Sequence, residues 1–439
     1  DRSKLEFDLE SQRQKQRSVP GYQLLDGKTV PTGVEWDRLL GYQSWSKPVT
    51  NESLNTSLKY SYQINDNWSS NLSASQSRVV VDDYSAFAYT FDTDGNYDIY
   101  DFRSPDDSYL TNQFKTGLNG AFNTGAWQHS LSLELSHAYK RHTQYESTYS
   151  MVNVGAGNIY NDPITHTPND RDLGNHYKSL DSQQTALNVL DQIEFNDAWS
   201  VLLGGKLLHL NESAYAADGN SIRDTDFNRF LPQLALMYQP WQNTHLYASY
   251  AKGISDGSQA PAYTDNAYVT LAPRRSTQYE LGLKQQWQEL LFTAALFDLT
   301  QDHQYTNLDN YYVTDGEQHN LGLELGLQGR VAENLDMTST LALIRSRLED
   351  IQVDAYKGYQ TQNVPTVRFA SHVSYQMPQV EGLRLLAGMQ YSSSKYANKT
   401  GTVKVSGYTV FDAGAAYNFR AYGYDNMLRL NVDNLFNKK

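Results

Sequence analysis

The sequence predicts an all-β chain whose antiparallel strands form a transmembrane β-barrel. Three observations lead to this fold class. Apolar and polar residues alternate with a period of two in segments of about ten residues. The connections between these segments are short and long in turn. The chain also holds 33 Tyr and 7 Trp, and such amphipathic rings collect at membrane interfaces and in ligand-contacting loops.

Bulk composition is compatible with this fold and argues against other classes. The mean hydropathy is -0.62, but a membrane barrel needs only every second strand residue to be apolar, so its average stays polar. No run approaches the roughly 18 apolar residues of a membrane-spanning helix. The net charge of -13, without any Lys/Arg-rich run, argues against a nucleic-acid partner. The absence of Cys removes disulfides, thiolate metal sites and Cys nucleophiles.

The clearest strand is "WQHSLSLELSHAY", from Trp127 to Tyr139. Leu131, Leu133 and Leu135 share one face with the two terminal rings. The opposite face carries Ser130, Ser132, Glu134 and Ser136. Twelve residues at about 3.3 Å each, tilted by about 40°, span roughly 30 Å, the height of an apolar band between two aromatic girdles. We expect the girdles to contain Trp68, Trp127, Tyr139, Trp199, Tyr279 and Tyr375.

Other strands repeat this pattern along the chain, and we count seventeen in all. Their apolar faces are Leu5/Phe7/Leu9, Phe114/Leu118/Phe122, Tyr279/Leu281/Leu283, Leu321/Leu323/Leu325/Leu327, Val367/Phe369/Val373/Tyr375, Leu383/Leu385/Met389/Tyr391 and Leu428/Leu430/Val432. The residues between them face the lumen of the predicted barrel. Among these, ionic residues that would form a hydrated wall are Glu134, Lys206, Lys284, Glu324, Arg368 and Arg429.

The connections predict which rim is outside the cell. Short turns such as "QINDN", "NTGA" and "VAEN" alternate with long, polar, aromatic-rich connections. We expect the long connections at 11–52, 82–110, 140–181, 211–228, 254–275, 302–317, 349–364 and 392–406. Bacterial outer-membrane barrels have short periplasmic turns and long extracellular loops, so function is expected at the long rim.

The odd strand count predicts that this is part of a larger barrel. Single-chain bacterial barrels have an even number of strands, because closure must leave no edge in lipid. The chain begins with Asp1 and runs directly into a strand, and its last strand, in "LRLNVDNLFNKK", runs toward the outer rim. We therefore expect further strands before residue 1 and a closing strand after residue 439.

Seven stretches, in this order and spacing, resemble the barrel of TonB-dependent siderophore receptors of the ferrichrome and hydroxamate type. They are "LLGYQSWSKPV", "NIYNDP", "LPQLALMYQPWQNTHLYASYAKG", "LAPRRSTQYELGLK", "HNLGLELGLQGRV", "GYTVFDAGAAYNF" and "LRLNVDNLFNKK". The resemblance implies a barrel of about 22 strands around an N-terminal plug. Residues 1–439 would be a partial barrel that lacks the plug, the first about four strands and the last strand.

The resemblance also implies a function. Such receptors bind a ferric siderophore at their outer loops and import it with energy that TonB transmits through the plug, without covalent chemistry and without a resident cofactor. The implied partners are the ferric siderophore, TonB and outer-membrane lipid, with phage or bacteriocin as further users of the loops, and the implied state is a monomer in the bacterial outer membrane.

Five aromatic residues are predicted to contact the ligand. The resemblance places Tyr22 of "SVPGYQLLDGKTVP" at one contact and matches Phe87 and Tyr89 of "VDDYSAFAYTF" to a contact pair. Tyr145 and Tyr149 of "RHTQYESTYS" lie near a further aromatic contact. The alternative for each ring is a role in loop packing. Ferrichrome receptors have a tryptophan where this chain has Leu24, which argues against ferrichrome itself.

Metal sites and enzymes find less support in the sequence. The turn "DTDGNYD" (92–98) has its Gly two places early for a calcium loop and no Glu at the twelfth position, so a solvated acidic turn is expected. The His pairs 137/142 and 166/176 lack ligand spacing, so no metal site is predicted.

An outer-membrane protease or phospholipase would be a smaller barrel with a Ser/His or Asp/His constellation, and none stands out.

Other transport functions remain as alternatives. Haem receptors carry FRAP and NPNL-like motifs, which the segment 254–282 lacks, yet haem, cobalamin or another metal chelate stays an alternative ligand. A passive porin would need an open lumen and would not carry the receptor stretches. A soluble propeller would show a repeat of about 40 to 50 residues, and successive hairpins show none.

Overall fold

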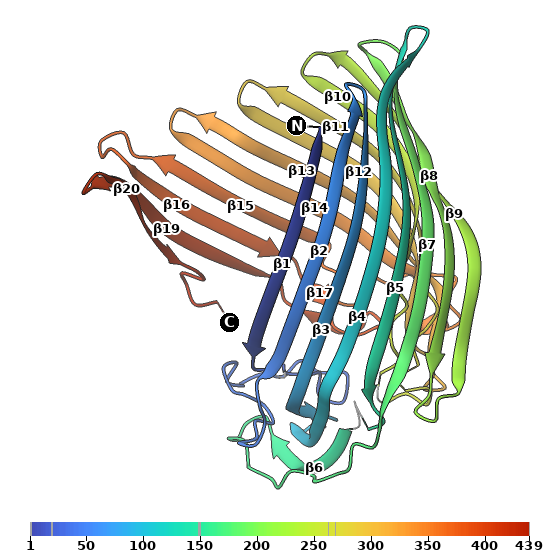
Figure 1. Cartoon of the computed structure of the whole chain (residues 1–439). Coiled ribbons are helices and arrows are strands. Elements are labelled where there is room, and N and C mark those ends of the chain that lie inside the picture. The colour runs from blue at the N-terminus through green and yellow to red at the C-terminus, as the bar shows by residue number, and fades with distance from the viewer. Residues whose placement is uncertain (1, 19–20, 148–150, 262, 268, 439) are drawn as a thin grey trace.

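One long antiparallel sheet makes up most of the molecule, as a computed structural model describes it for residues 2–18, 21–147, 151–261, 263–267 and 269–438. The sheet is strongly curved, and its strands tilt across it (Figure 1). The strands that pair in chain order are β1 (Ser3–Gln16), β2 (Val49–Asn65), β3 (Trp68–Tyr89), β4 (Asn96–Thr124), β5 (Trp127–Tyr145), β7 (His176–Glu194), β8 (Trp199–Tyr215), β9 (Ser221–Trp241), β10 (Thr244–Ser255), β11 (Arg274–Trp287), β12 (Leu290–Thr306), β13 (Tyr312–Ala332), β14 (Leu335–Glu349), β15 (Val367–Gln376), β16 (Leu383–Ser392), β19 (Tyr408–Ala421) and β20 (Tyr424–Val432).

These seventeen strands confirm the count that the sequence predicts. Three shorter strands are additional: β6 (Met151–Asn158) pairs with the outer part of β4, and β17 (Lys395–Tyr396) pairs with β18 (Lys404–Val405) inside a connection. Within the described residues, β1 pairs only with β2 and β20 only with β19, so these two are the edges of the sheet. The described helix is a single 3₁₀ turn at Asp354–Tyr356, and no described helix is long and apolar enough to cross a membrane.

The strand register separates an apolar face from a polar face. Leu133 lies opposite Leu118 on one side and Val189 on the other. One residue along, Glu134 lies opposite Gly117 and Asn188. Residues that are directly opposite share a face, so the whole sheet has one apolar and one polar surface. Followed from strand to strand, the register puts all six predicted lumen residues on the polar face and all six predicted girdle rings on the apolar face.

The polar face is the concave one. The ammonium of Lys140, on the polar face of β5, lies 2.8 Å from the Asp256 carboxylate, which follows β10. Because β7, β8 and β9 separate these strands in the sheet, such a contact forms only across the interior of the curve. The apolar face is therefore convex, and Leu135 and Trp127 on it are each 48% exposed. No packed core covers these residues, as expected for side chains that meet lipid.

The two rims differ as predicted, with short turns at one end of the strands and longer connections at the other (Figure 1). The prediction of long loops at 82–110, 211–228 and 302–317 was wrong, because strands β3–β4, β8–β9 and β12–β13 continue through most of these residues. Beyond the apolar band no lipid imposes a strict alternation on these hairpins, while the backbone ladder continues. A polar stretch therefore reads as loop although it is paired strand.

Candidate functional site: the outer mouth

The β3–β4 hairpin forms one wall of the outer mouth. Its outward side is covered by the connection 17–48, and the largest buried cluster of the described residues forms between them. The cluster consists of Leu25, Leu40, Ala86, Ala88, Phe91, Tyr97, Ile99 and Ile159. Polar contacts reinforce it: Gln43 is fully buried, and its side chain donates to the Ile164 carbonyl and accepts from the His166 amide. This wall is therefore a packed structure.

The other side of the same hairpin carries Phe87 and Tyr89. The register places them on the concave face together with Tyr100 and Phe102. Phe87 lies 6.1 Å from Tyr89 and 5.4 Å from Phe102, and Tyr89 lies 6.1 Å from Tyr100, as ring centroids. Burial, and to a smaller extent the neighbouring Tyr263 hydroxyl, raise the pKa of Tyr89. The predicted contact pair is thus part of a four-ring surface that faces the connection 256–273 across the mouth.

Tyr22 occupies a different surface. Its hydroxyl donates to the Glu35 carbonyl at 2.7 Å, and its ring packs edge-on against Trp36 at 5.1 Å. It lines a cavity of about 1240 Å³ with Thr90 and Phe91, and neither Phe87 nor Tyr89 lines that cavity. The structure therefore brings Phe87 and Tyr89 together and sets Tyr22 on a separate wall.

The remaining predicted contact residues are peripheral or outside the described residues. Tyr145 ends β5 and packs edge-on against His176, with ring centroids 4.9 Å apart. It lines neither of the two mouth cavities. Tyr149 lies outside the described residues. The role of these two tyrosines stays a prediction.

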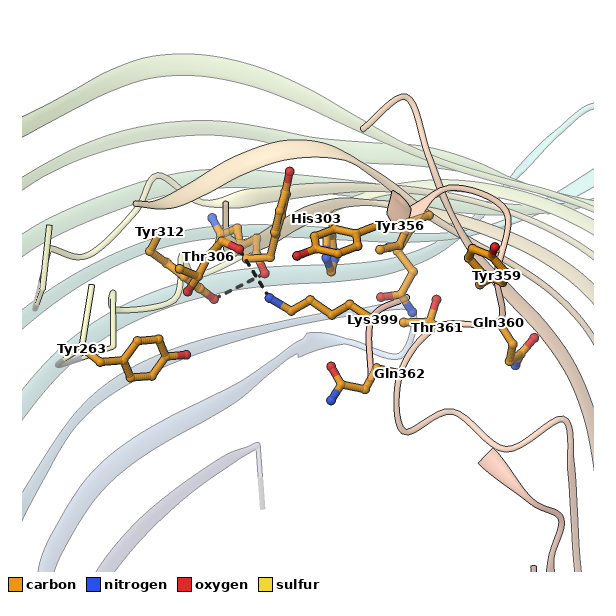
Figure 2. Close-up of a pocket in the computed structure, with 14 residues that line it drawn as sticks. Tyr263, His303, Thr306, Tyr312, Tyr356, Tyr359, Gln360, Thr361, Gln362 and Lys399 are labelled. Atoms are coloured by element: carbon orange, nitrogen blue, oxygen red, sulfur yellow. Dashed lines mark hydrogen bonds between the residues drawn. The ribbon is translucent and has the colours of Figure 1, made fainter. Parts of the chain in front are cut away.

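A second, smaller cavity adjoins the first, and Lys399 lies between them. The smaller cavity has a volume of about 340 Å³. It is lined largely by tyrosines and amides, and Figure 2 shows the side chain of Lys399 reaching past Tyr356 toward Thr306, with His303 beside it. Lys399, Tyr356 and Gln362 line both cavities. The two cavities are therefore parts of one recess at the mouth.

The recess has an unusual charge environment. The Lys399 ammonium lies 5.4 Å from the ring centre of Tyr305 and 5.8 Å from that of Tyr356, and donates weakly to the Thr306 carbonyl at 3.5 Å. Burial lowers the pKa of Lys399. The nearby carboxylate of Asp315 is already engaged by the Tyr305 hydroxyl at 2.7 Å and the Gln352 amide at 3.0 Å.

His303 lies on the part of β12 that projects beyond the membrane. The apolar band ends at Asp298, which contacts His319 at 2.8 Å across the strands, and a register shift follows at Asp302. Burial, with the cations of Lys399 and Arg274, lowers the pKa of His303 to about 4. The imidazole is therefore neutral at ordinary pH, and it stacks on the Tyr305 ring with centroids 5.3 Å apart.

The structure also joins a serine, a histidine and an aspartate that the sequence did not connect. Ser179 Oγ lies 2.7 Å from His142 Nδ1, and the Nε2 of the same ring contacts Asp107. All three residues are less than 9% exposed, and Tyr109 stacks on the imidazole at 4.2 Å. A substrate cannot reach a serine covered in this way, so the network serves to fasten β4, β5 and β7 together near the outer rim.

The acidic turn at 92–98 is held by its own hydrogen bonds. The Asp92 carboxylate accepts the amides of Asp94 and Asn96 at 2.9 and 2.8 Å, which is the arrangement of an Asx turn. In the part of the chain that the structure describes, no group of three or more His, Cys, Asp or Glu residues is arranged to hold a metal ion.

The sequence reasoning missed the recess around Lys399, although a signal was present. Between Glu381 and Asp412 the chain has no acidic residue, while the connection 393–407 carries Lys395, Lys399 and Lys404. In a chain with a net charge of -13, such a segment is unusual. The partners of Lys399, however, come from β12 and from the connection 350–366, and only the fold brings these segments together.

Comparison with known proteins identifies the family. The family model "TonB dependent receptor-like, beta-barrel" matches residues 1–435. The ferrichrome receptor FcuA of Yersinia enterocolitica is 25% identical over 337 residues, which cover 74% of this chain and 44% of that receptor. The ferrioxamine receptor of Yersinia enterocolitica is 23% identical over 410 residues, which cover 87% of this chain and 54% of that receptor. The chain thus spans about half the length of these relatives.

The fold agrees with this match. The crystal structure of BauA, the ferric preacinetobactin receptor of Acinetobacter baumannii, superposes with a TM-score of 0.84 at 20% identity, over 100% of this chain and 66% of that one. The family prediction made from the seven stretches is confirmed. The family model matches nearly the whole chain, and the seventeen-strand sheet has the two faces and the unequal rims expected of such a barrel. The chain therefore belongs to the TonB-dependent receptor family and forms part of the β-barrel wall of that family.

Proposed function

We propose that this chain forms the barrel and outer mouth of a bacterial outer-membrane receptor that binds a ferric siderophore and imports it with energy from TonB. The observation that carries the proposal is the recess at the mouth. Aromatic rings from the connection 17–48, from β12 and β13 and from the connection 350–366 line it, and polar donors lie between them. Ferric chelates are compact and partly apolar, so rings and a few donors are the groups expected to hold them.

The comparisons and the barrel wall support this proposal. The two relatives are named for ferrichrome and ferrioxamine, and the BauA structure for ferric preacinetobactin. The polar concave face, with Glu134, Lys206 and Lys284 on it, offers a hydrated wall along which a polar cargo passes. An apolar convex face matches the outer membrane, with the long connections outside the cell.

Growth rescue tests the proposal. The full-length product of the gene that encodes this chain is expressed in an iron-starved bacterial strain that lacks its own siderophore receptors. The panel contains ferrichrome, ferrioxamine, ferric enterobactin, ferric citrate, haem and cobalamin. Rescue by at least one ferric siderophore, lost when TonB is deleted, is expected. Rescue that persists without TonB would favour a passive porin, and rescue by haem alone or binding of cobalamin alone would move the ligand to another class.

A further inference from the structure

The ammonium of Lys399 lies at the junction of the two mouth cavities without an ionic partner. It contacts two tyrosine rings and one carbonyl oxygen. No ion pair of Lys399 occurs among the described residues, and the nearby carboxylate of Asp315 is bonded to the Tyr305 hydroxyl instead. The side chain is half-buried, and a partly desolvated charge without a partner is costly, so such a group usually has one in the functional state.

The surroundings of Lys399 are cationic as well. The connection 393–407 supplies Lys395, which lines the larger cavity, and contains no acidic residue. Arg274, at the start of β11, adds a positive field at His303, and its Nε has no hydrogen-bond partner. Asp26, which also lines the larger cavity, is paired with Lys28 at 2.8 Å. The charged side chains that line the recess therefore carry a net positive charge, although the chain as a whole is negative.

Neutral aromatic and amide side chains complete the surface around this cation. The aromatic rings of Tyr305 and Tyr356 flank the ammonium, and the amide of Gln362 lines both cavities. Rings and amides of this kind contact the organic part of a planar aromatic ligand, while a cation binds its anionic oxygens. The arrangement therefore favours a ligand that combines aromatic or compact organic parts with exposed negative charge.

We propose that the Lys399 ammonium donates a hydrogen bond to an anionic oxygen of the ferric chelate. This receptor therefore prefers chelates of net negative charge, of the catecholate or carboxylate type, over neutral ferric hydroxamates. This inference rests on the proposed function, because it names the substrate class of the same mouth. It departs from the names of the two Yersinia relatives, and the carrying observation is the unpaired cation between two cavities. The ion pair would form at a half-buried site in the recess, where a charge-assisted hydrogen bond is stronger than in open water.

The test compares two ligands and three variants of the full-length receptor. Ferric enterobactin, a tris-catecholate trianion, is the anionic probe, and ferrichrome, a neutral tris-hydroxamate, is the neutral probe. Lys399→Met keeps most of the aliphatic stem and removes the charge, whereas Lys399→Arg keeps the charge. The matched control is Lys404→Met, because Lys404 belongs to the same connection but is exposed and lies over the Tyr396 ring at 5.0 Å.

Binding is measured by quenching of intrinsic tryptophan fluorescence in detergent, and folding by heat-modifiable migration on gels. Lys399→Met is expected to weaken binding of ferric enterobactin by about ten- to a hundredfold, the value of one hydrogen bond to a charged group. Lys399→Arg and Lys404→Met are expected to stay within about threefold of the parent. An equal loss in Lys399→Met and Lys404→Met would show a general charge effect and overturn the inference.

The other outcomes separate the two proposals. If ferrichrome binds and rescues growth while ferric enterobactin and ferric citrate do not, the inference fails and the proposed function stands. If anionic chelates bind but Lys399→Met leaves their affinity unchanged, the role assigned to Lys399 fails. If no ferric chelate binds or rescues, the proposed function fails and the inference fails with it.

Discussion

An arginine in place of Leu133 tests which face of the sheet meets lipid. Leu133 lies six residues from both Trp127 and Tyr139, the two girdle rings of β5. At about 3.3 Å per residue and a tilt of about 40°, each ring is roughly 15 Å away along the membrane normal. That places Leu133 near the centre of a hydrocarbon layer about 30 Å thick. The side chain of Leu133→Arg would therefore project into the most apolar part of the bilayer.

The expected cost is about 2 to 4 kcal/mol of folding free energy, the range for arginine at the midplane on a barrel exterior. The matched control is Glu134→Arg, one residue along the same strand. Glu134 lies 3.9 Å from the Lys115 ammonium, and both side chains are about one third exposed, at 37% and 35%. Losing such a hydrated ion pair and placing a second cation nearby is expected to cost at most about 1 kcal/mol.

Urea titration of the full-length receptor refolded in lipid vesicles, followed by tryptophan fluorescence, measures both variants. The midpoint should fall clearly for Leu133→Arg and little for Glu134→Arg. Equal losses would mean that the two faces have similar environments, and a larger loss for Glu134→Arg would mean that the polar face meets lipid. Either result would refute the assignment of the faces from the strand register.

Three further predictions concern the mouth. Phe87→Ala or Tyr89→Ala should weaken binding of the cognate ferric siderophore by roughly ten- to a hundredfold, because each ring contributes about 1 to 3 kcal/mol. The control Tyr215→Ala should change the affinity by less than about threefold. Fluorescence quenching measures all three affinities. The folded-state pKa of His303 lies at about 4, below its ordinary value of 6.5. The stability of the mouth should therefore fall as the pH drops from 6.5 toward 4, by on the order of 3 kcal/mol at most. Hydrogen exchange of residues 302–315 measures this loss. Ser179→Ala should lower the free energy of unfolding by roughly 1 to 3 kcal/mol, because a buried imidazole nitrogen loses its hydrogen-bond partner. Since Ser179 is covered, the parent receptor should not react with a fluorophosphonate, which labels accessible nucleophilic serines.

Each of these three has a result that would contradict it. Unchanged affinity in both ring variants would remove the four-ring surface from the site. The same pH dependence in a variant with His303→Gln would assign the acid sensitivity to other groups. Covalent labelling of Ser179 by the fluorophosphonate in the folded receptor would show that the serine is reachable and would reopen the question of hydrolysis.

The membrane-spanning part of the fold could be predicted because lipid imposes a simple rule on it. Every second residue must be largely apolar over about ten residues, and "WQHSLSLELSHAY" follows that rule with three leucines and two terminal rings, interrupted by His129 and His137. The register follows from it, since a slip of one residue would turn Leu133 and its neighbours to the wrong face. Outside the membrane no such rule applies, and the paired strands at 82–89 and 96–110 therefore read as loop.

The mouth was only partly predictable for a related reason. The resemblance predicts Phe87 and Tyr89 as a contact pair, and their common face follows only once β3 is known to continue to Tyr89. The distance from Tyr22 to these rings depends on how the connection 17–48 packs against Ala86 and Ala88, which local patterns do not encode. Lys399 acquires its surroundings from segments about 90 and 40 residues earlier in the chain, a relation that only tertiary structure provides.

The long pairing of β3 and β4 has a consequence for survival at a cell surface. The ladder continues from the membrane to Tyr89 opposite Asp98, and β6 pairs with the other edge of β4 from Asn96 to Phe102. An extracellular protease needs an extended, unpaired segment in its active-site cleft, and these residues offer one only after several backbone hydrogen bonds break together. The stretch that displays Phe87 and Tyr89 should therefore resist nicking, and a ligand should meet rings whose positions are already fixed before it arrives.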